Sequence, residues 1–201
     1  MRCQELFGFK EPLYMAIKKK TVLNITVILF ILSFFVTPLG HYGKLFLNRI
    51  FSFSPYIVDE ANRRQITDFD WRLKDAEWNL VNFEKSKGKI TLINFWASWR
   101  LPSEAELKSI QDLYNQYKDQ VDFYIITNEN RPPVEEFMQK HDFTFPVTYL
   151  IIGDKSAVEV PEKPPYSYLI DQTGTIVIEQ DGIADWNTST VRDLIDDLIA
   201  R

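Results

Sequence analysis

The stretch Ile90-Thr-Leu-Ile-Asn-Phe-Trp96, followed by Ala97-Ser-Trp-Arg-Leu-Pro102, decides the fold of this 201-residue chain. Its first seven residues form a nearly continuous run of β-branched, aliphatic and aromatic side chains, which predicts a central buried strand. A proline suits the first turn of a helix, so we expect a helix from about 102 to 118. Its apolar residues recur at helical spacing: Leu107, Ile110, Leu113, Tyr114 and Tyr117.

Further elements follow on both sides of this strand–helix unit. In chain order the pattern predicts a hairpin (69–73 and 78–83), the strand 90–96, the helix 102–118, a buried strand (121–127), a short helix (133–141), a second hairpin (166–170 and 175–179) and a C-terminal helix. That last helix has Val191, Leu194, Ile195, Leu198 and Ile199 on one face, and Asn187 or Thr188 can cap it. This order predicts an α/β sheet with helices on both faces.

Composition and charge exclude several classes of function. The formal net charge is −5 and the sequence pI is about 5.2, which argues against a nucleic-acid partner. A single cysteine, Cys3, excludes an intramolecular disulfide, a C-x-x-C pair and a zinc site built on cysteines. The two histidines, His41 and His141, have no metal-ligand spacing. We therefore expect neither a metal nor a cofactor.

Residues 21–39 are an uncharged and strongly apolar run that predicts a membrane anchor. At 1.5 Å per residue they cover roughly 28 Å, close to the hydrocarbon thickness of a bilayer. Lys18, Lys19 and Lys20 precede the run, so the positive-inside rule predicts a cytoplasmic N-terminus. The run contains no A-x-A cleavage pattern, which favours an uncleaved anchor over a signal peptide. Met15 is an alternative start.

This division predicts four regions: a cytoplasmic N-terminus (1–20), the anchor (21–39), a linker (40–65) and a folded domain (66–201). Apolar residues between His41 and Val58 are compatible with an amphipathic piece at the membrane surface or with packing onto the domain. The expected location is a bacterial inner membrane, with a single crossing and the C-terminal domain in the periplasm or outside.

Two motifs resemble a known family. Leu92-Ile-Asn-Phe-Trp-Ala-Ser-Trp99 with Pro102 resembles the active-site run of TlpA/ResA-type thioredoxin-like proteins, and Glu106 matches an acidic residue of their helix. Pro165-Tyr-Ser-Tyr-Leu-Ile-Asp171 with Gly174 resembles their second motif, whose proline is cis. The resemblance covers roughly residues 66–201. It implies a thioredoxin-like fold, a central mixed sheet flanked by helices, and thiol–disulfide chemistry in the cell envelope.

The chain departs from this family at the two reactive positions. The alignment places Arg100 where the attacking cysteine would be and Ser103 where the resolving cysteine would be. Disulfide exchange requires a thiolate and then a second thiol, and neither a guanidinium nor a serine hydroxyl replaces them. We therefore expect no catalytic residue. Arg100 should lie in solvent or pair with an acid such as Glu104. We favour the interpretation that this position has drifted at a site no longer in use; the alternative is that Arg100 recognises an anion or carboxylate of a partner.

Other residues of the former site bear on whether it can still bind a partner. Pro164, before the expected cis-proline Pro165, has no N–H to donate to an extended substrate. Trp96, Trp99 and Tyr166 are expected to form a partly exposed aromatic rim beside Pro102. No histidine is expected near the motif, and Ser103 has no evident base, which leaves another kind of enzyme poorly supported.

The leading hypothesis is a non-catalytic module that binds or scaffolds envelope proteins at the membrane. The alternative is a TlpA/ResA-like oxidoreductase subunit, acting in envelope disulfide or cytochrome maturation, whose cysteines come from a partner.

Overall fold

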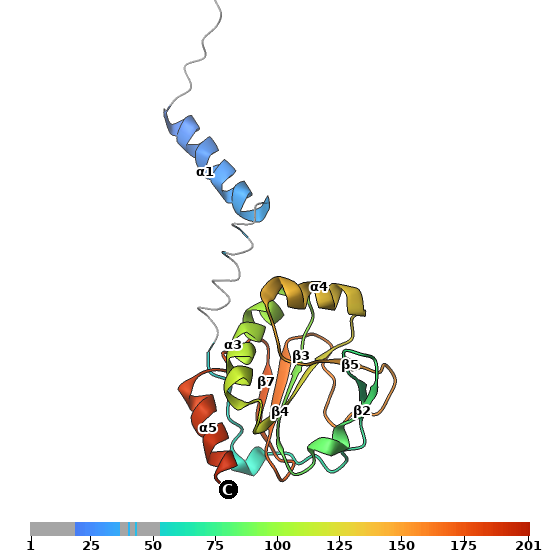
Figure 1. Ribbon diagram of the computed structural model, residues 1–201. Coiled ribbons are helices and arrows are strands. Elements are labelled where there is room, and N and C mark those ends of the chain that lie inside the picture. Colours follow the sequence, from blue (N-terminus) through green and yellow to red (C-terminus); the bar gives the residue numbers. More distant parts are fainter. Residues whose placement is uncertain (1–18, 37–39, 41–42, 44–52) are drawn as a thin grey trace, which may run out of the picture. The chain divides into compact units, whose positions relative to one another are not determined.

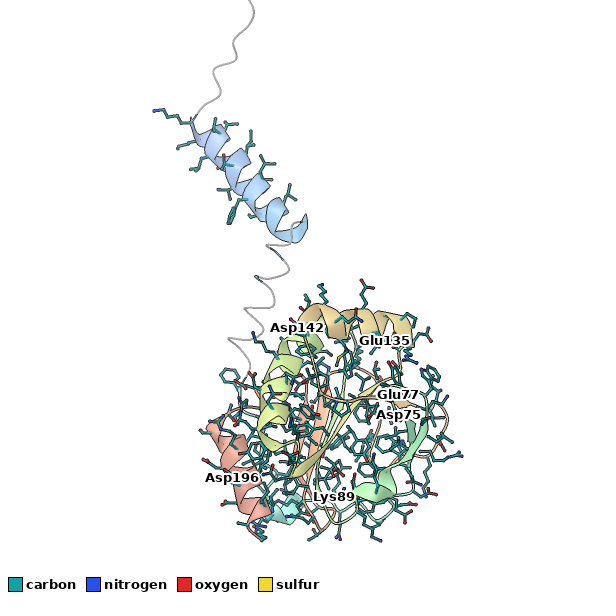
Figure 2. All side chains as sticks on the ribbon, in the orientation of Figure 1. Asp75, Glu77, Lys89, Glu135, Asp142 and Asp196 are labelled. Carbon is teal, nitrogen blue, oxygen red and sulfur yellow. The ribbon has the colours of Figure 1, made fainter. Side chains whose placement is uncertain are left out.

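The computed structural model describes residues 19–36, 40, 43 and 53–201. Helix α1 (Lys19–Val36) and the folded domain belong to separate units, and each is described by itself. The side chains of α1 between Val22 and Leu32 are exposed on every side of the helix (Figure 2). In the part of the chain that the structure describes, no helix reaches the length and hydropathy of a membrane span. Of the expected anchor, residues 37–39 lie outside the described residues.

The domain is built on one seven-stranded mixed sheet with the order β2-β1-β5-β4-β3-β6-β7. The strands are β1 (Arg72–Lys74), β2 (Leu80–Asn82), β3 (Ile90–Phe95), β4 (Val121–Thr127), β5 (Val147–Leu150), β6 (Tyr166–Ile170) and β7 (Ile176–Asp181). All six residues of β3 are buried, and the strand pairs in parallel with β4 and antiparallel with β6. The prediction of a central buried strand is confirmed.

Most of the predicted elements are present with similar bounds. Both hairpins form, as β1–β2 and β6–β7, although β1 and β2 are only three residues long. The helices are α3 (Leu101–Tyr117), α4 (Arg131–His141) and α5 (Ser189–Ile199), and the side chain of Thr188 caps α5 by accepting from the N–H of Val191. Strand β5 was not predicted and is an addition to the element order.

The expectation of α-helices on both faces is wrong for the described domain, because α3, α4 and α5 all contribute to one core cluster on one face (Figure 1). The physical reason is the position of β5. The crossovers β3–α3–β4 and β4–α4–β5 proceed in the same direction across the sheet, and right-handed crossovers then place both helices on the same side.

The opposite face is covered by a 3-10 turn, η2 (Phe83–Ser86), and by irregular chain. Phe83 and Ile66 are buried there against sheet residues such as Ile93 and Tyr124. The stretch from 53 to 66 lies along β7: the N–H of Val58 donates to Val177 O at 2.9 Å, and isolated bridges join Ile57 to Ile178 and Gln65 to Thr175. The described end of the expected linker therefore packs onto the domain.

Candidate functional site

The site forms where β3 ends and α3 begins. Arg100 is the N-cap residue of α3, with an extended backbone and no side-chain cap, and Pro102 lies in the first turn. The Pro164–Pro165 peptide bond is cis, as expected. Because Phe95 pairs with Tyr166 across β3 and β6, the cis-proline loop and the β3–α3 loop meet at the same edge of the sheet.

The three aromatic residues that were expected to form a rim differ in exposure. Trp99 is 69% exposed, whereas Trp96 is 2% exposed and packs its ring 5.2 Å from that of Phe137 in α4. Tyr166 is half-buried, and its hydroxyl donates to Glu179 at 2.8 Å. Burial and the Glu179 carboxylate raise the pKa of Tyr166 to about 12. Trp99 alone of these three presents a large open surface.

Arg100 lies against this exposed indole. Its guanidinium carbon is 5.4 Å from the centre of the Trp99 ring, and its Nε is buried without a hydrogen-bond partner among the described residues. A cation near a helix N-terminus costs about 0.3–1 kcal/mol, and a cation–π contact at an exposed site returns about 0.5–1 kcal/mol. The two effects are of equal size, so Trp99 offsets the unfavourable position of the cation.

Ser103 occupies the second reactive position and is fully buried. Its Oγ accepts a hydrogen bond from the N–H of Ala97 at 3.3 Å. The hydroxyl therefore closes the β3–α3 loop onto the first turn of the helix. A buried hydroxyl in this structural role is unsuited to attack on a substrate.

Glu129, which the sequence analysis did not single out, holds the same loop from the end of β4. Its carboxylate accepts from the N–H of Ser98 at 2.6 Å and from the Ser98 hydroxyl at 2.7 Å, and the Thr127 hydroxyl donates to it at 3.3 Å. Because β3 and β4 are parallel, their carboxyl ends lie at the same edge of the sheet. A polar residue just after β4 was therefore the feature of the sequence that could have placed Glu129 beside the β3–α3 loop. Glu129 fixes the loop that carries Trp99 and Arg100.

A histidine does lie beside the motif, contrary to the expectation. The Nε2 of His141, at the end of α4, is 3.7 Å from Oε1 of Glu104 in the first turn of α3. Glu104 is 7% exposed. Arg100, which was expected in solvent or paired with an acid such as Glu104, contacts the Trp99 ring. The contact between His141 and Glu104 could not be predicted from the sequence. The two residues are far apart along the chain, and they meet only because α3 and α4 lie on the same face of the sheet.

A buried carboxyl lies one turn further into α3. Glu106 is 1% exposed and accepts from Trp186 Nε1 at 2.9 Å, from Asn94 Nδ2 at 2.8 Å and from the N–H of Ala184 at 3.3 Å. Burial raises the pKa of Glu106 to about 8, although these three donors favour the charged form. Asn94 also donates to the Ser167 hydroxyl at 2.8 Å. The family resemblance had identified Glu106 as the match of an acidic residue in the helix, and the structure adds the groups that donate hydrogen bonds to it.

Together the fold and these positions define a thioredoxin-like α/β domain in which an arginine and a buried serine occupy the two redox positions. Comparison with protein families agrees: the AhpC/TSA family model matches residues 64–183, more than half of the chain, so the chain belongs to that family.

Curated relatives support the same grouping. The chain is 30% identical over 113 residues to the thiol-disulfide oxidoreductase ResA of Oceanobacillus iheyensis, covering 53% of this chain and 59% of that protein. It is 27% identical over 114 residues to the thioredoxin-like protein YneN of Bacillus subtilis, covering 53% and 65%. The matched part thus spans about three fifths of the length of these relatives.

Solved structures share the fold. A thiol:disulfide interchange protein of Chlorobium tepidum aligns with a TM-score of 0.53 at 19% identity, covering 68% of this chain and 97% of that chain. A secreted thiol-disulfide isomerase of Corynebacterium glutamicum aligns with a TM-score of 0.56 at 17% identity, covering 73% and 92%. The TlpA/ResA-type resemblance is confirmed, and at these identities the structural matches establish the fold alone.

Proposed function

We propose that this chain is a redox-inactive binding or scaffolding module, held at a bacterial inner membrane by residues 21–39, with its folded domain on the outer side. One observation carries the loss of redox activity: Arg100 and Ser103 stand at both thiol positions, and the single cysteine of the chain, Cys3, precedes the anchor. Exchange of a disulfide needs two thiols within reach of each other. Losing both removes the reaction instead of slowing it.

Trp99 and Arg100 support the binding part of the proposal. Tryptophan and arginine are the residues enriched at energetically dominant positions of protein interfaces. Trp99 is 69% exposed, and the arginine that contacts its ring keeps N–H donors for a carboxylate. The loop that carries them is fixed by Glu129 and by Ser103, so little ordering is needed on binding. The partner in this proposal is an envelope protein with an acidic group beside an apolar surface.

The test of redox inactivity is insulin reduction coupled to dithiothreitol. The full chain is expected to give no rate above the uncatalysed reaction. Arg100→Cys/Ser103→Cys is the positive control, since a thiol at a helix N-terminus has a lowered pKa and a second thiol stands one turn away. Measurable turnover by the unmodified chain would refute the proposal. Failure of the double variant to form a disulfide would show instead that the two positions are wrongly aligned.

A photo-reactive side chain tests the binding surface. Placed at position 99 in the membrane-bound chain, it should cross-link one envelope protein, and that product should disappear when Arg100 is changed to Glu. Trp78, which is 45% exposed elsewhere on the domain, is the matched position for the control. Identical products from both positions would contradict a specific surface at Trp99.

A further inference from the structure

The sheet has a gap beside the first half of β4, at the end opposite the Trp99 loop. β4 pairs with β3 from Val121 onward, but β5 joins its other side only from Ile125, which pairs with Val147. On that side Val121–Tyr124 has no strand partner among the described residues. At about 3.3 Å per residue, the gap is about four residues, or roughly 13 Å, long.

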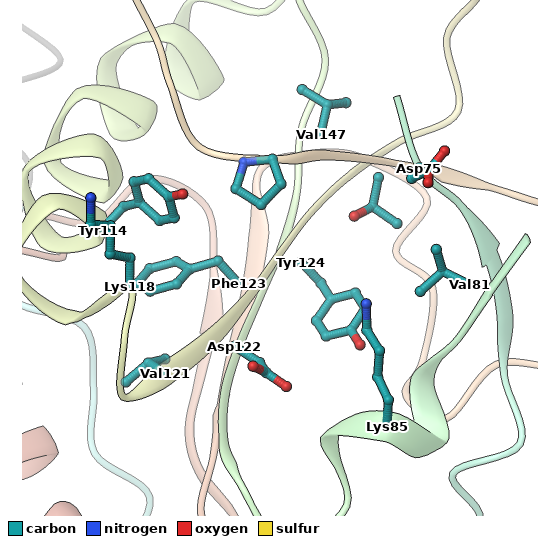
Figure 3. A pocket seen from close by; sticks show the side chains of 12 residues that line it. Asp75, Val81, Lys85, Tyr114, Lys118, Val121, Asp122, Phe123, Tyr124 and Val147 are labelled. Carbon is teal, nitrogen blue, oxygen red and sulfur yellow. The ribbon is translucent and has the colours of Figure 1, made fainter. Parts of the chain in front are cut away.

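A groove with a volume of about 250 Å³ occupies this gap (Figure 3). Tyr114 of α3 and Lys118, the C-cap residue of that helix, lie on one side, and Val81 and Lys85 lie on the other. Its remaining lining residues are Asp75, Val121, Asp122, Phe123, Tyr124, Pro146, Val147 and Thr148. The lining therefore combines apolar and aromatic surface with an open strand edge.

Charge in the groove favours an acidic occupant. Both lysines are exposed, and neither forms an ion pair within the described part of the chain; Lys85 lies 5.7 Å above the Tyr124 ring. The two carboxylates are already engaged. Asp122 binds Lys89 at 3.2 Å, and Asp75 accepts hydrogen bonds from its own turn, from the N–H groups of Glu77 and Asn79. Lys85 also acts on the Asp75 carboxylate and helps to lower its pKa. Together with Lys89, the groove and its rim hold three ammonium groups against two carboxylates, which leaves a surplus of one positive charge.

We propose that this groove binds a short extended peptide segment with acidic side chains, which adds to the free edge of β4 between Lys118 and Lys85. An added strand satisfies main-chain donors and acceptors along the edge, and the apolar walls accept its alternate side chains. Its carboxylates reach the two lysines at the rim. The site is separate from Trp99 and Arg100, so it goes beyond the proposed function and does not depend on it.

Fluorescence anisotropy with a labelled hexapeptide of alternating valine and glutamate, titrated with the full chain in mild detergent, tests the proposal. Lys85→Glu/Lys118→Glu is expected to weaken binding more than tenfold, and each lysine changed to alanine about two- to fivefold, as for partly exposed charge pairs. Lys108→Glu/Lys140→Glu changes two other exposed lysines by the same total charge and should alter affinity less than twofold.

Strand addition is tested by changing the peptide and leaving the protein intact. Methylation of alternate peptide nitrogens removes donors without changing charge, so it should weaken binding at least tenfold. A valine–lysine peptide should bind at least tenfold more weakly. Equal binding of the methylated peptide, equal binding of the basic peptide or equal loss with the control variant would each overturn the proposal. Phenylacetate, a small aromatic carboxylate, serves as a second probe. If it bound and the peptide did not, the proposal of a peptide site would also be overturned.

Discussion

At the scale of single residues, the two positions that match the reactive cysteines of the family hold residues with structural contacts. The sequence was enough to locate Arg100 and Ser103 and to show that a cation stood at a helix N-terminus. It did not give the contact of the Arg100 guanidinium with the Trp99 ring, since adjacent side chains come together only in a particular loop conformation. Nor did it give the burial of Ser103, which depends on how tightly the loop closes on the helix.

Glu106 leads to a prediction about pH. The ordinary pKa of this carboxyl is 4.5, and burial raises it to about 8 in the folded domain. Between these pH values the folded state retains a proton that the unfolded state has released. The free energy of unfolding therefore falls as pH rises, by up to about 1.4 kcal/mol per pH unit from this group. The stabilising contribution is complete below about pH 4.5 and is lost above about pH 8.

Glu106→Gln should remove this part of the pH dependence, because an amide has no proton to lose. The added amide can pair with the Asn94 Oδ1, which is buried without a partner, if the Asn94 side chain turns over. Urea unfolding at about pH 5 and about pH 8 is expected to show the variant gaining on the wild-type domain as pH rises. Glu136→Gln on the exposed surface of α4 is the control. A constant difference between Glu106→Gln and wild type would contradict the role of burial.

At the scale of secondary structure, the elements with strong periodic patterns were predicted most accurately, and one short strand, β5, was not predicted. β3, β4 and α3 have strong patterns, and their bounds were foreseen within one or two residues. β5 is only four residues long and follows Pro146, and its run of Val, Thr, Tyr and Leu was overlooked. Without β5 the direction of the β4–α4–β5 crossover was unknown, so the face on which α4 lies could not be predicted. Strand order is set by contacts between residues that are far apart in the sequence.

The turn between β6 and β7 gives a prediction at the same scale. Gly174 has φ +85°, and an added Cβ would lie 3.1 Å from Ile66 O and 3.0 Å from the Phe69 ring. The left-handed conformation costs about 1–2 kcal/mol for a residue with a Cβ, and overpacking adds about 1–3 kcal/mol. The Ile66 backbone has little room to retreat, because its N–H is bonded to Gly174 O at 2.8 Å.

Gly174→Ala is therefore expected to lower the free energy of unfolding by more than Gly153→Ala, with urea denaturation as the measurement. Gly153 has a similar φ of +82° with nothing within 4 Å of an added Cβ, so it isolates the backbone cost. The difference between the two variants should be about 1–3 kcal/mol. If both variants lost the same free energy of unfolding, the β6–β7 turn would be able to accommodate the added Cβ without an overpacking penalty.

At the scale of the whole molecule, the proposed topology can be tested through the three lysines that precede the apolar run 21–39. Lys18–Lys20 should keep the N-terminus in the cytoplasm, so an alkaline phosphatase fused after Arg201 is expected to be active. The same enzyme fused just after Lys20 should be inactive. Changing the three lysines to glutamate should reduce the activity of the first fusion. An inactive fusion at Arg201 beside an active one at Lys20 would invert the proposed orientation.

The N-terminal limit of the domain is a second whole-molecule question. The sequence placed it at 66, but the stretch before that residue lies on β7, an edge strand of the sheet. The N–H of Ile176 donates to Arg64 O at 2.8 Å, and the Arg64 guanidinium binds Glu179 at 2.6 Å. Nearer the start, Val58 donates to β7 and Ile57 forms a bridge with it. The sequence left packing of residues 41–58 onto the domain open as one of two alternatives, but it could not identify β7 as the partner, because the stretch has neither a helical nor a strand period.

Fragments that begin at 53, 59 and 66 should therefore differ in stability, in that descending order. Starting at 59 removes the bridge at Ile57 and the bond from Val58, and starting at 66 also removes the Arg64 contacts. The shortest fragment leaves the β7 edge open, and an open edge promotes association between chains. Urea denaturation should give the lowest midpoint for 66–201, and light scattering should show that it alone associates. If all three fragments unfold at one midpoint as monomers, residues 53–65 are dispensable and the boundary at 66 holds.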